Sequence, residues 1–154
     1  MDEQIKLEEA LSKFTREYLK IFNRLENNIS YSIRYMSKIE KHALTIDYIQ
    51  SLSFSKKIKN LKEIIAKKNL TEEFSQWFEK LECCRVLRNH IVHGSWVVRW
   101  HIDKPIRFDA RKIKEGDSNS VSGEYTGKDL SDKLNELECV ENDFSFLRKK
   151  YEKF

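Results

Sequence analysis

Residues that break helices are scarce in this sequence. Only four glycines and one proline occur among its 154 residues, and these two types interrupt helices more strongly than any others. Long helices are therefore the expected result. The length suits one domain with one core, and the balance of 40% hydrophobic and 35% charged residues is typical of a globular chain. We expect a single helical domain over residues 1–154.

Apolar residues recur at steps of three and four over most of the chain, which is the period of an amphipathic helix. This spacing predicts a long first helix over residues 5–36, a short helix or irregular link over 42–52, and helices over 54–65, 71–93 and 126–151. The fold class is therefore mainly all-α, an up-and-down bundle of about four to five helices.

The period changes after Gly94. Residues 95–102 are rich in aromatic and β-branched types, Pro105 interrupts them, and residues 106–113 roughly alternate between apolar and polar. This pattern is typical of short strands. We expect a small β-hairpin or extended arm over residues 95–125, inserted before the last helix.

Other patterns narrow the class of protein. The sequence contains no run of about 18 apolar residues, so it predicts no membrane-spanning helix. Its first residues carry no secretory signal. The expectation is a cytoplasmic protein with no membrane partner. The three cysteines, Cys83, Cys84 and Cys139, then read as reduced thiols. No nucleotide-binding or other cofactor pattern is present, so no cofactor is expected.

The helix over residues 54–65 and the lysines after it form the most basic part of the chain. Six lysines stand against one glutamate between residues 54 and 68, in a chain whose net charge is +4. Lys56, Lys57 and Lys59 are candidate RNA-binding residues on the polar face of this helix, because a cluster of lysines attracts a polyanion. A simply solvated face is the alternative.

The segment Arg88-Asn89-His90-Ile91-Val92-His93 carries the residues best suited to chemistry. A histidine titrates near neutral pH and can take up or release a proton during a reaction. An arginine can stabilise a negatively charged group with two directed donors. Arg88 and His93 are therefore candidate functional residues.

This segment resembles the Arg-x(4–6)-His motif of the HEPN superfamily of small α-helical domains, with Arg88, Asn89 and His93 at the motif positions. The resemblance implies a metal-independent endoribonuclease that leaves a 2′,3′-cyclic phosphate, with Arg88, Asn89 and His93 as its catalytic residues. In such an enzyme, His93 would transfer a proton at the 2′-hydroxyl or at the leaving 5′-oxygen. Arg88 would stabilise the charge that builds on the phosphate, and Asn89 would be the orienting group. The resemblance also implies a role as a toxin or phage-defence effector, RNA as substrate, and an antitoxin protein as a possible partner. The match rests on six residues, and the helical organisation extends it loosely over the rest of the chain.

Helix geometry limits how the motif can act. At about 100° per residue, Arg88 and His93 lie roughly 140° apart on an ideal helix, whereas Arg85, Asn89 and His93 share a face. Arg88 and His93 can converge if the helix end frays at His93 or if two subunits combine. HEPN ribonucleases commonly place two motifs across a shared dimer cleft, so we expect a two-fold homodimer. Arg85 is then a further candidate for binding RNA.

The sequence allows further interpretations of its histidines, of its aromatic residues and of the chain as a whole. His90, His93 and His101 match no strong zinc spacing, and we expect no metal site. Trp96, Trp100 and Tyr125 are candidates for stacking on bases or for packing within the arm. The chain as a whole could be a non-catalytic module that binds RNA or protein, or a purely structural dimerisation domain.

Overall fold

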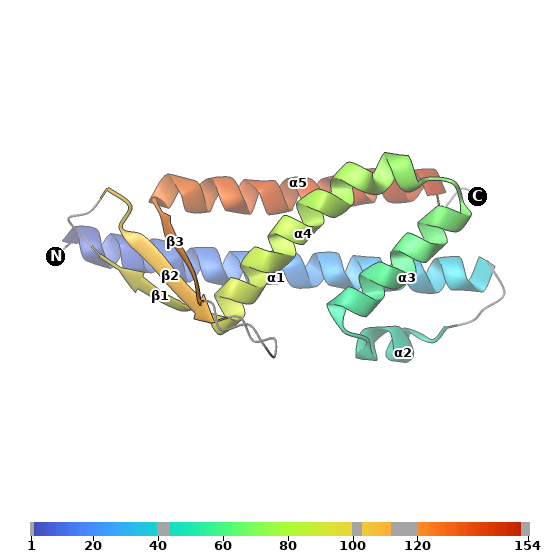
Figure 1. The fold of residues 1–154 in the computed structure, drawn as a ribbon, viewed down its shortest axis with the longest axis horizontal. Helices are drawn as coiled ribbons and strands as arrows, with labels where there is room; N and C mark the ends of the chain where they lie inside the picture. The colour runs from blue at the N-terminus through green and yellow to red at the C-terminus, as the bar shows by residue number, and fades with distance from the viewer. Residues whose placement is uncertain (1, 40–43, 100–102, 112–119, 152–154) are drawn as a thin grey trace. The chain divides into compact units, whose positions relative to one another are not determined.

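The computed structural model describes residues 2–39, 44–99, 103–111 and 120–151, and over these residues the chain is mainly α-helical (Figure 1). Its elements are α1 (Asp2–Ile39), α2 (Ile46–Ser51), α3 (Phe54–Lys67), α4 (Thr71–His93), β1 (Ser95–Val98), β2 (Ile106–Arg111), β3 (Ser120–Tyr125) and α5 (Gly127–Tyr151). The predicted fold class is confirmed, including the small sheet between α4 and α5. No helix in these ranges is both long and apolar enough to cross a membrane.

The chain forms two compact units. The first consists of Met1–Lys20 and Leu81–Glu138, and the second of Ile21–Lys80 and Cys139–Phe154. Helices α1, α4 and α5 each contribute residues to both units, and the sheet belongs to the first. A single domain over residues 1–154 stays a prediction.

The helix boundaries follow from local side-chain chemistry. Thr126 and Asp129 form a reciprocal capping box at the start of α5. The Thr126 N–H donates to the Asp129 carboxylate at 2.8 Å, and the Asp129 N–H donates to the Thr126 hydroxyl at 3.0 Å. Ser53 caps α3 by accepting from the Lys56 N–H at 3.3 Å. Asn69, with a φ of 59°, adopts the left-handed conformation that ends α3.

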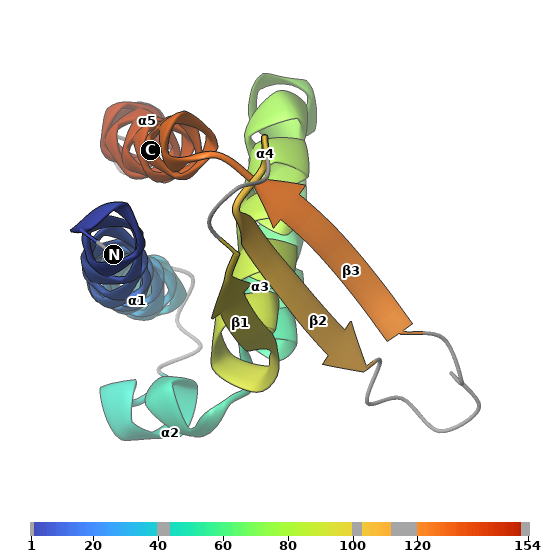
Figure 2. The ribbon, with the colours of Figure 1, turned by 90° about the vertical axis from the view of Figure 1, so that its left-hand side faces the viewer.

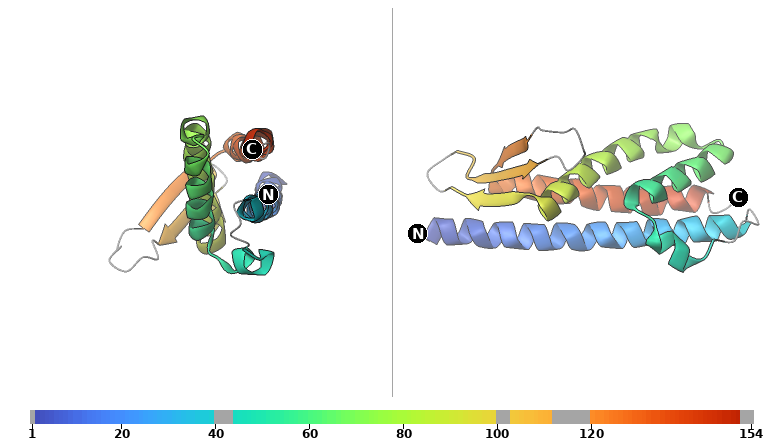
Figure 3. Two further views of the ribbon diagram at one scale, coloured as in Figure 1. Left: turned by 90° about the vertical axis from the view of Figure 1, so that its right-hand side faces the viewer. Right: turned by 60° about the horizontal axis from the view of Figure 1, so that its bottom comes forward.

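The second unit includes parts of α1, α4 and α5 together with α3, whose ribbons Figure 3 shows. Aromatic side chains join these helices. Phe22 of α1 and Phe54 of α3 bring their ring centroids to 5.0 Å. Trp77 of α4 stacks on Phe144 of α5 at 5.0 Å, and its indole N–H donates to the Val140 carbonyl at 2.9 Å. These contacts lie within a core in which Phe22 and Phe144 are almost fully buried.

In the first unit, the three strands form an antiparallel sheet in the order β1-β2-β3 (Figure 2). The sequence predicts a hairpin or extended arm here, and the structure adds a third strand. Gly123 lies inside β3, directly opposite Phe108 of β2. A Cβ atom at position 123 would lie 2.3 Å from Cε1 of the Phe108 ring. The glycine therefore gives this ring room to lie across β3.

Candidate functional site

The motif residues lie in the last two turns of α4. Arg88 and Asn89 are half-buried neighbours, and Nη1 of Arg88 donates to Oδ1 of Asn89 at 2.9 Å. His93 is exposed and is the last residue of the helix. Arg88 lies at the edge of a buried stripe that includes Cys84 and Ile91, which explains why an arginine interrupts the apolar pattern of the sequence.

The end of α4 is regular rather than frayed. The N–H of Gly94 donates to the carbonyl of His90 at 2.8 Å, which completes the last helical turn around His93. Arg88 and His93 therefore keep the separation of roughly 140° around the helix axis that ideal geometry gives. Fraying of the helix end was one of two ways in which Arg88 and His93 could converge. The structure shows no such fraying at His93.

Arg85 is engaged with a neighbour on the same helix. Its Nε atom donates to the Glu82 carboxylate at 2.8 Å, and this hydrogen bond raises the pKa of the Arg85 guanidinium. Arg85, Asn89 and His93 share one side of α4, as predicted. An RNA phosphate would have to compete with Glu82 for Arg85.

The three predicted RNA-binding lysines of α3 do not share a surface. Lys56 and Lys59 are exposed, but Lys57 is 4% exposed and forms an ion pair with Glu26 of α1 at 3.5 Å. The expectation that Lys57 stands on the solvent-facing side of the helix is therefore wrong. Lys57 precedes the buried Leu61 by four residues, and its long methylene chain lets it occupy that buried face.

Metal ligands and stacking residues were the other sequence-based candidates. Among the described residues, no group of three or more His, Cys, Asp or Glu side chains is placed to hold a metal ion. His101 and Trp100 lie outside the described residues. Trp96 packs between elements, with its ring centroid 6.4 Å from Phe14 and 5.0 Å from Phe108. Its indole N–H donates to the His90 carbonyl at 3.3 Å.

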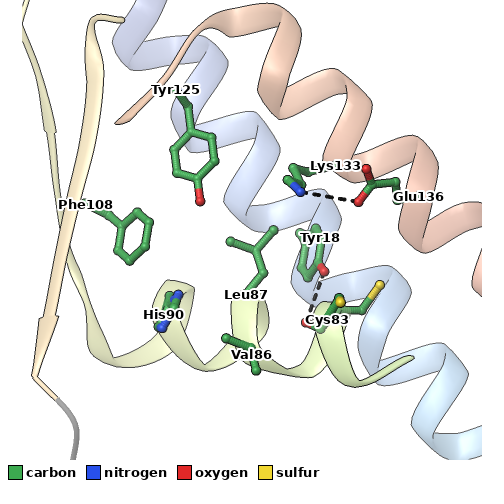
Figure 4. Close-up of a pocket in the computed structure, with 10 residues that line it drawn as sticks. Tyr18, Cys83, Val86, Leu87, His90, Phe108, Tyr125, Lys133 and Glu136 are labelled. Carbon is green, nitrogen blue, oxygen red and sulfur yellow. Dashed lines mark hydrogen bonds and ion pairs between the residues drawn. The ribbon is translucent and has the colours of Figure 1, made fainter. Parts of the chain in front are cut away.

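The structure adds a pocket that sequence reasoning missed. It lies in the first unit, beside the motif, and has a volume of about 260 Å³ (Figure 4). Its lining comes from α1, α4, the sheet and α5: Tyr18, Cys83, Cys84, Val86, Leu87, His90, Phe108, Tyr125, Lys133 and Glu136. The only sequence signals were His90, considered as a metal ligand, and Tyr125, considered for stacking.

The polar groups of the pocket differ in how they are bonded. The Tyr18 hydroxyl donates to the Cys84 carbonyl at 3.1 Å, and Lys133 pairs with Glu136 at 3.5 Å. Burial raises the pKa of the Tyr125 phenol. It lowers the pKa of His90, whose imidazole stacks on Phe108 with 4.7 Å between centroids. His90 is therefore neutral at neutral pH and offers one donor and one acceptor.

Comparisons of the chain with protein-family models, with curated proteins and with solved structures found no match. The assignment of function therefore depends on the geometry of the site and on the resemblance of its motif.

Proposed function

We propose that this protein is a metal-independent endoribonuclease of the HEPN kind that acts as a two-fold homodimer. The observation that carries the proposal is the arrangement at the end of α4. There, Nη1 of the Arg88 guanidinium donates a hydrogen bond to Oδ1 of Asn89 at 2.9 Å, and the exposed His93 follows Asn89 by about one helical turn. The mainly helical fold with a sheet inserted before α5 supports the resemblance.

The geometry of one chain supports the proposed dimer. Arg88 and His93 point to different sides of a regular helix end, so one copy does not bring them together. The exposed side of α4 that carries Asn89 and His93 also carries Val86 and Val92, which are 40% and 50% exposed. An apolar surface of this kind gains stability when a partner covers it. A second copy is the partner that would complete the site, with Arg88 and Asn89 of one copy facing His93 of the other.

The proposed reaction is a transesterification within the RNA strand. The 2′-oxygen forms a bond to the adjacent phosphorus, and the bond from phosphorus to the 5′-oxygen breaks. The histidine accepts the proton of the 2′-hydroxyl, and water protonates the leaving 5′-oxygen, or the two roles are exchanged. Arg88 stabilises the extra negative charge on the non-bridging phosphate oxygens, and Asn89 holds the guanidinium in position. The products are a 2′,3′-cyclic phosphate and a 5′-hydroxyl.

The test is cleavage of total RNA by purified protein in excess EDTA, compared with identically prepared His93→Ala and Arg88→Ala variants. We expect cleavage by the wild type and a loss of at least about 100-fold for His93→Ala, which is the usual contribution of a general acid or base. His93 is exposed, so the variant should remain folded by circular dichroism. Equal cleavage by wild type and variants would refute the assignment.

A non-catalytic RNA-binding module is the second candidate. Lys56 and Lys59 are exposed on the same helix, α3, and binding through such lysines would weaken steeply with salt. Salt-sensitive RNA binding without cleavage, lost in the Lys56→Glu and Lys59→Glu double variant, would favour this candidate over the ribonuclease.

A further inference from the structure

The pocket of the first unit has flat walls. The rings of His90 and Phe108 are stacked at 4.7 Å with 28° between their planes, and those of Phe108 and Tyr125 lie 5.7 Å apart at 21°. Trp96 continues the series beyond Phe108, at 5.0 Å and 30°. Phe108 is buried in the middle of this stack, whereas His90 and Tyr125 are half-buried and line the pocket. These two rings offer flat surfaces suited to a planar aromatic ligand.

Two polar groups at this wall have unused hydrogen-bonding capacity. Within the described part of the chain, the Tyr125 hydroxyl and the His90 imidazole form no hydrogen bond with the protein. Figure 4 shows the Tyr125 hydroxyl pointing into the space between Phe108, His90 and Leu87. Phenol and neutral imidazole each offer a donor and an acceptor, so they match a ligand whose edge carries both.

The charged side chains of the pocket lie on α5. Lys133 and Glu136 are 40% and 58% exposed and pair with each other at 3.5 Å. Exposed pairs of this kind are weak and exchange partners readily. The Lys133 ammonium is therefore available to a phosphate attached to a ligand in the pocket, while the deeper lining, Tyr18 and Leu87, is buried.

We propose that this pocket binds a single unpaired nucleobase. A base has two flat faces that stack on aromatic side chains and an edge that carries hydrogen-bond donors and acceptors. The choice of a base over another planar heterocycle rests on the proposed function. Val86 links the two sites, because it lines the pocket and also belongs to the exposed side of α4 that carries Asn89 and His93. A base in this pocket would select single-stranded or looped RNA beside the motif.

The test is a chemical-shift titration of isotopically labelled full-length protein with each of the four nucleoside 5′-monophosphates, and with ribose 5-phosphate as the ligand that lacks a base. We expect at least one nucleotide to shift the amide signals of Val86, His90 and Tyr125, and ribose 5-phosphate to leave them unchanged. Tyr125→Leu, which removes the ring, should weaken binding by about tenfold or more, the usual contribution of one stacked base. Tyr125→Phe should weaken it less, since only the hydroxyl is lost.

Tyr31→Phe is the matched control, because Tyr31 is 56% exposed and lies in the other unit; its nucleotide affinity should equal that of the wild type. The proposal is overturned if no nucleotide shifts the pocket amides, if ribose 5-phosphate shifts them equally, or if affinity is insensitive to both Tyr125 variants. These outcomes are separate from those of the cleavage assay. Nucleotide binding without cleavage would refute the ribonuclease alone, and His93-dependent cleavage without nucleotide binding would refute the pocket alone.

Discussion

Replacing Gly123 by alanine would force a methyl group into the ring of Phe108. The added Cβ would lie 2.3 Å from Cε1, 3.0 Å from Cδ1 and 3.1 Å from Cζ of that ring. Carbon atoms pack best at about 3.5–4.0 Å, so the ring must move. It has little room to do so, because Phe108 is 2% exposed and its ring contacts His90, Trp96 and Tyr125.

The magnitude follows from two opposing effects. Overpacking a filled core costs about 1–3 kcal/mol. Replacing glycine by alanine also restricts the unfolded chain, which stabilises the fold by about 0.4–1 kcal/mol. We therefore expect Gly123→Ala to lower the free energy of unfolding by about 1–2 kcal/mol, and the melting temperature by about 2–4 °C for each kcal/mol. Thermal and urea unfolding followed by circular dichroism would measure both quantities.

Gly127 provides the matched control. It is the first residue of α5, and a Cβ there would have no neighbouring atom within 4 Å. Gly127→Ala should be neutral or should stabilise the protein by up to about 1 kcal/mol, because alanine favours the helix. The reasoning is refuted if Gly123→Ala is as stable as Gly127→Ala.

Three further predictions concern the helix ends and the core. Asn69→Ala should destabilise the protein by about 1 kcal/mol in urea unfolding, since alanine is strained at a φ of 59°, while Asn69→Gly should not. Trp77→Phe should cost about 0.5–1.5 kcal/mol in the same assay, because it removes the 2.9 Å hydrogen bond from the buried indole to the Val140 carbonyl; equal stability would contradict a stabilising role for this bond. The hydrogen bonds from Thr126 lower the pKa of the Asp129 carboxyl, so its stabilising effect is present above the ordinary aspartate pKa and is lost as the pH falls through the lowered value. Asp129→Asn should be less stable than the wild type at neutral pH, and the two unfolding curves should converge in acid; a gap that persists in acid would contradict this.

The helices could be predicted well because local chemistry determines their limits. Ser53, Thr126 and Gly94 mark boundaries in the sequence, and the structure begins or ends helices beside each of them. The lysine face was less predictable. A periodicity argument treats every lysine as polar, yet Lys57 lies on the buried side of α3, where Glu26 of a distant helix balances its charge. That partner is set by tertiary packing and cannot be found in the local sequence.

The third strand and the pocket were missed for related reasons. The β3 segment Ser-Val-Ser-Gly-Glu-Tyr has little of the β-branched and aromatic enrichment that marks strands, and only its register with β2 reveals why a glycine stands opposite Phe108. The pocket draws its lining from four separated parts of the chain, including Tyr18, His90, Tyr125 and Lys133. No local pattern brings those residues together. The segment Arg88–His93, by contrast, could be proposed from the sequence because it lies within one helix.

The central claim is that Arg88 of one copy and His93 of another form one site, and mixing inactive variants tests it most directly. Arg88→Ala and His93→Ala proteins would be unfolded and refolded together, then assayed for RNA cleavage in EDTA beside each variant refolded alone. A mixed dimer retains one site with both residues intact, so the account predicts that the mixture recovers a fraction of wild-type cleavage while each variant alone stays inactive. An inactive mixture whose mixed dimers are demonstrated by mass spectrometry would contradict the shared site.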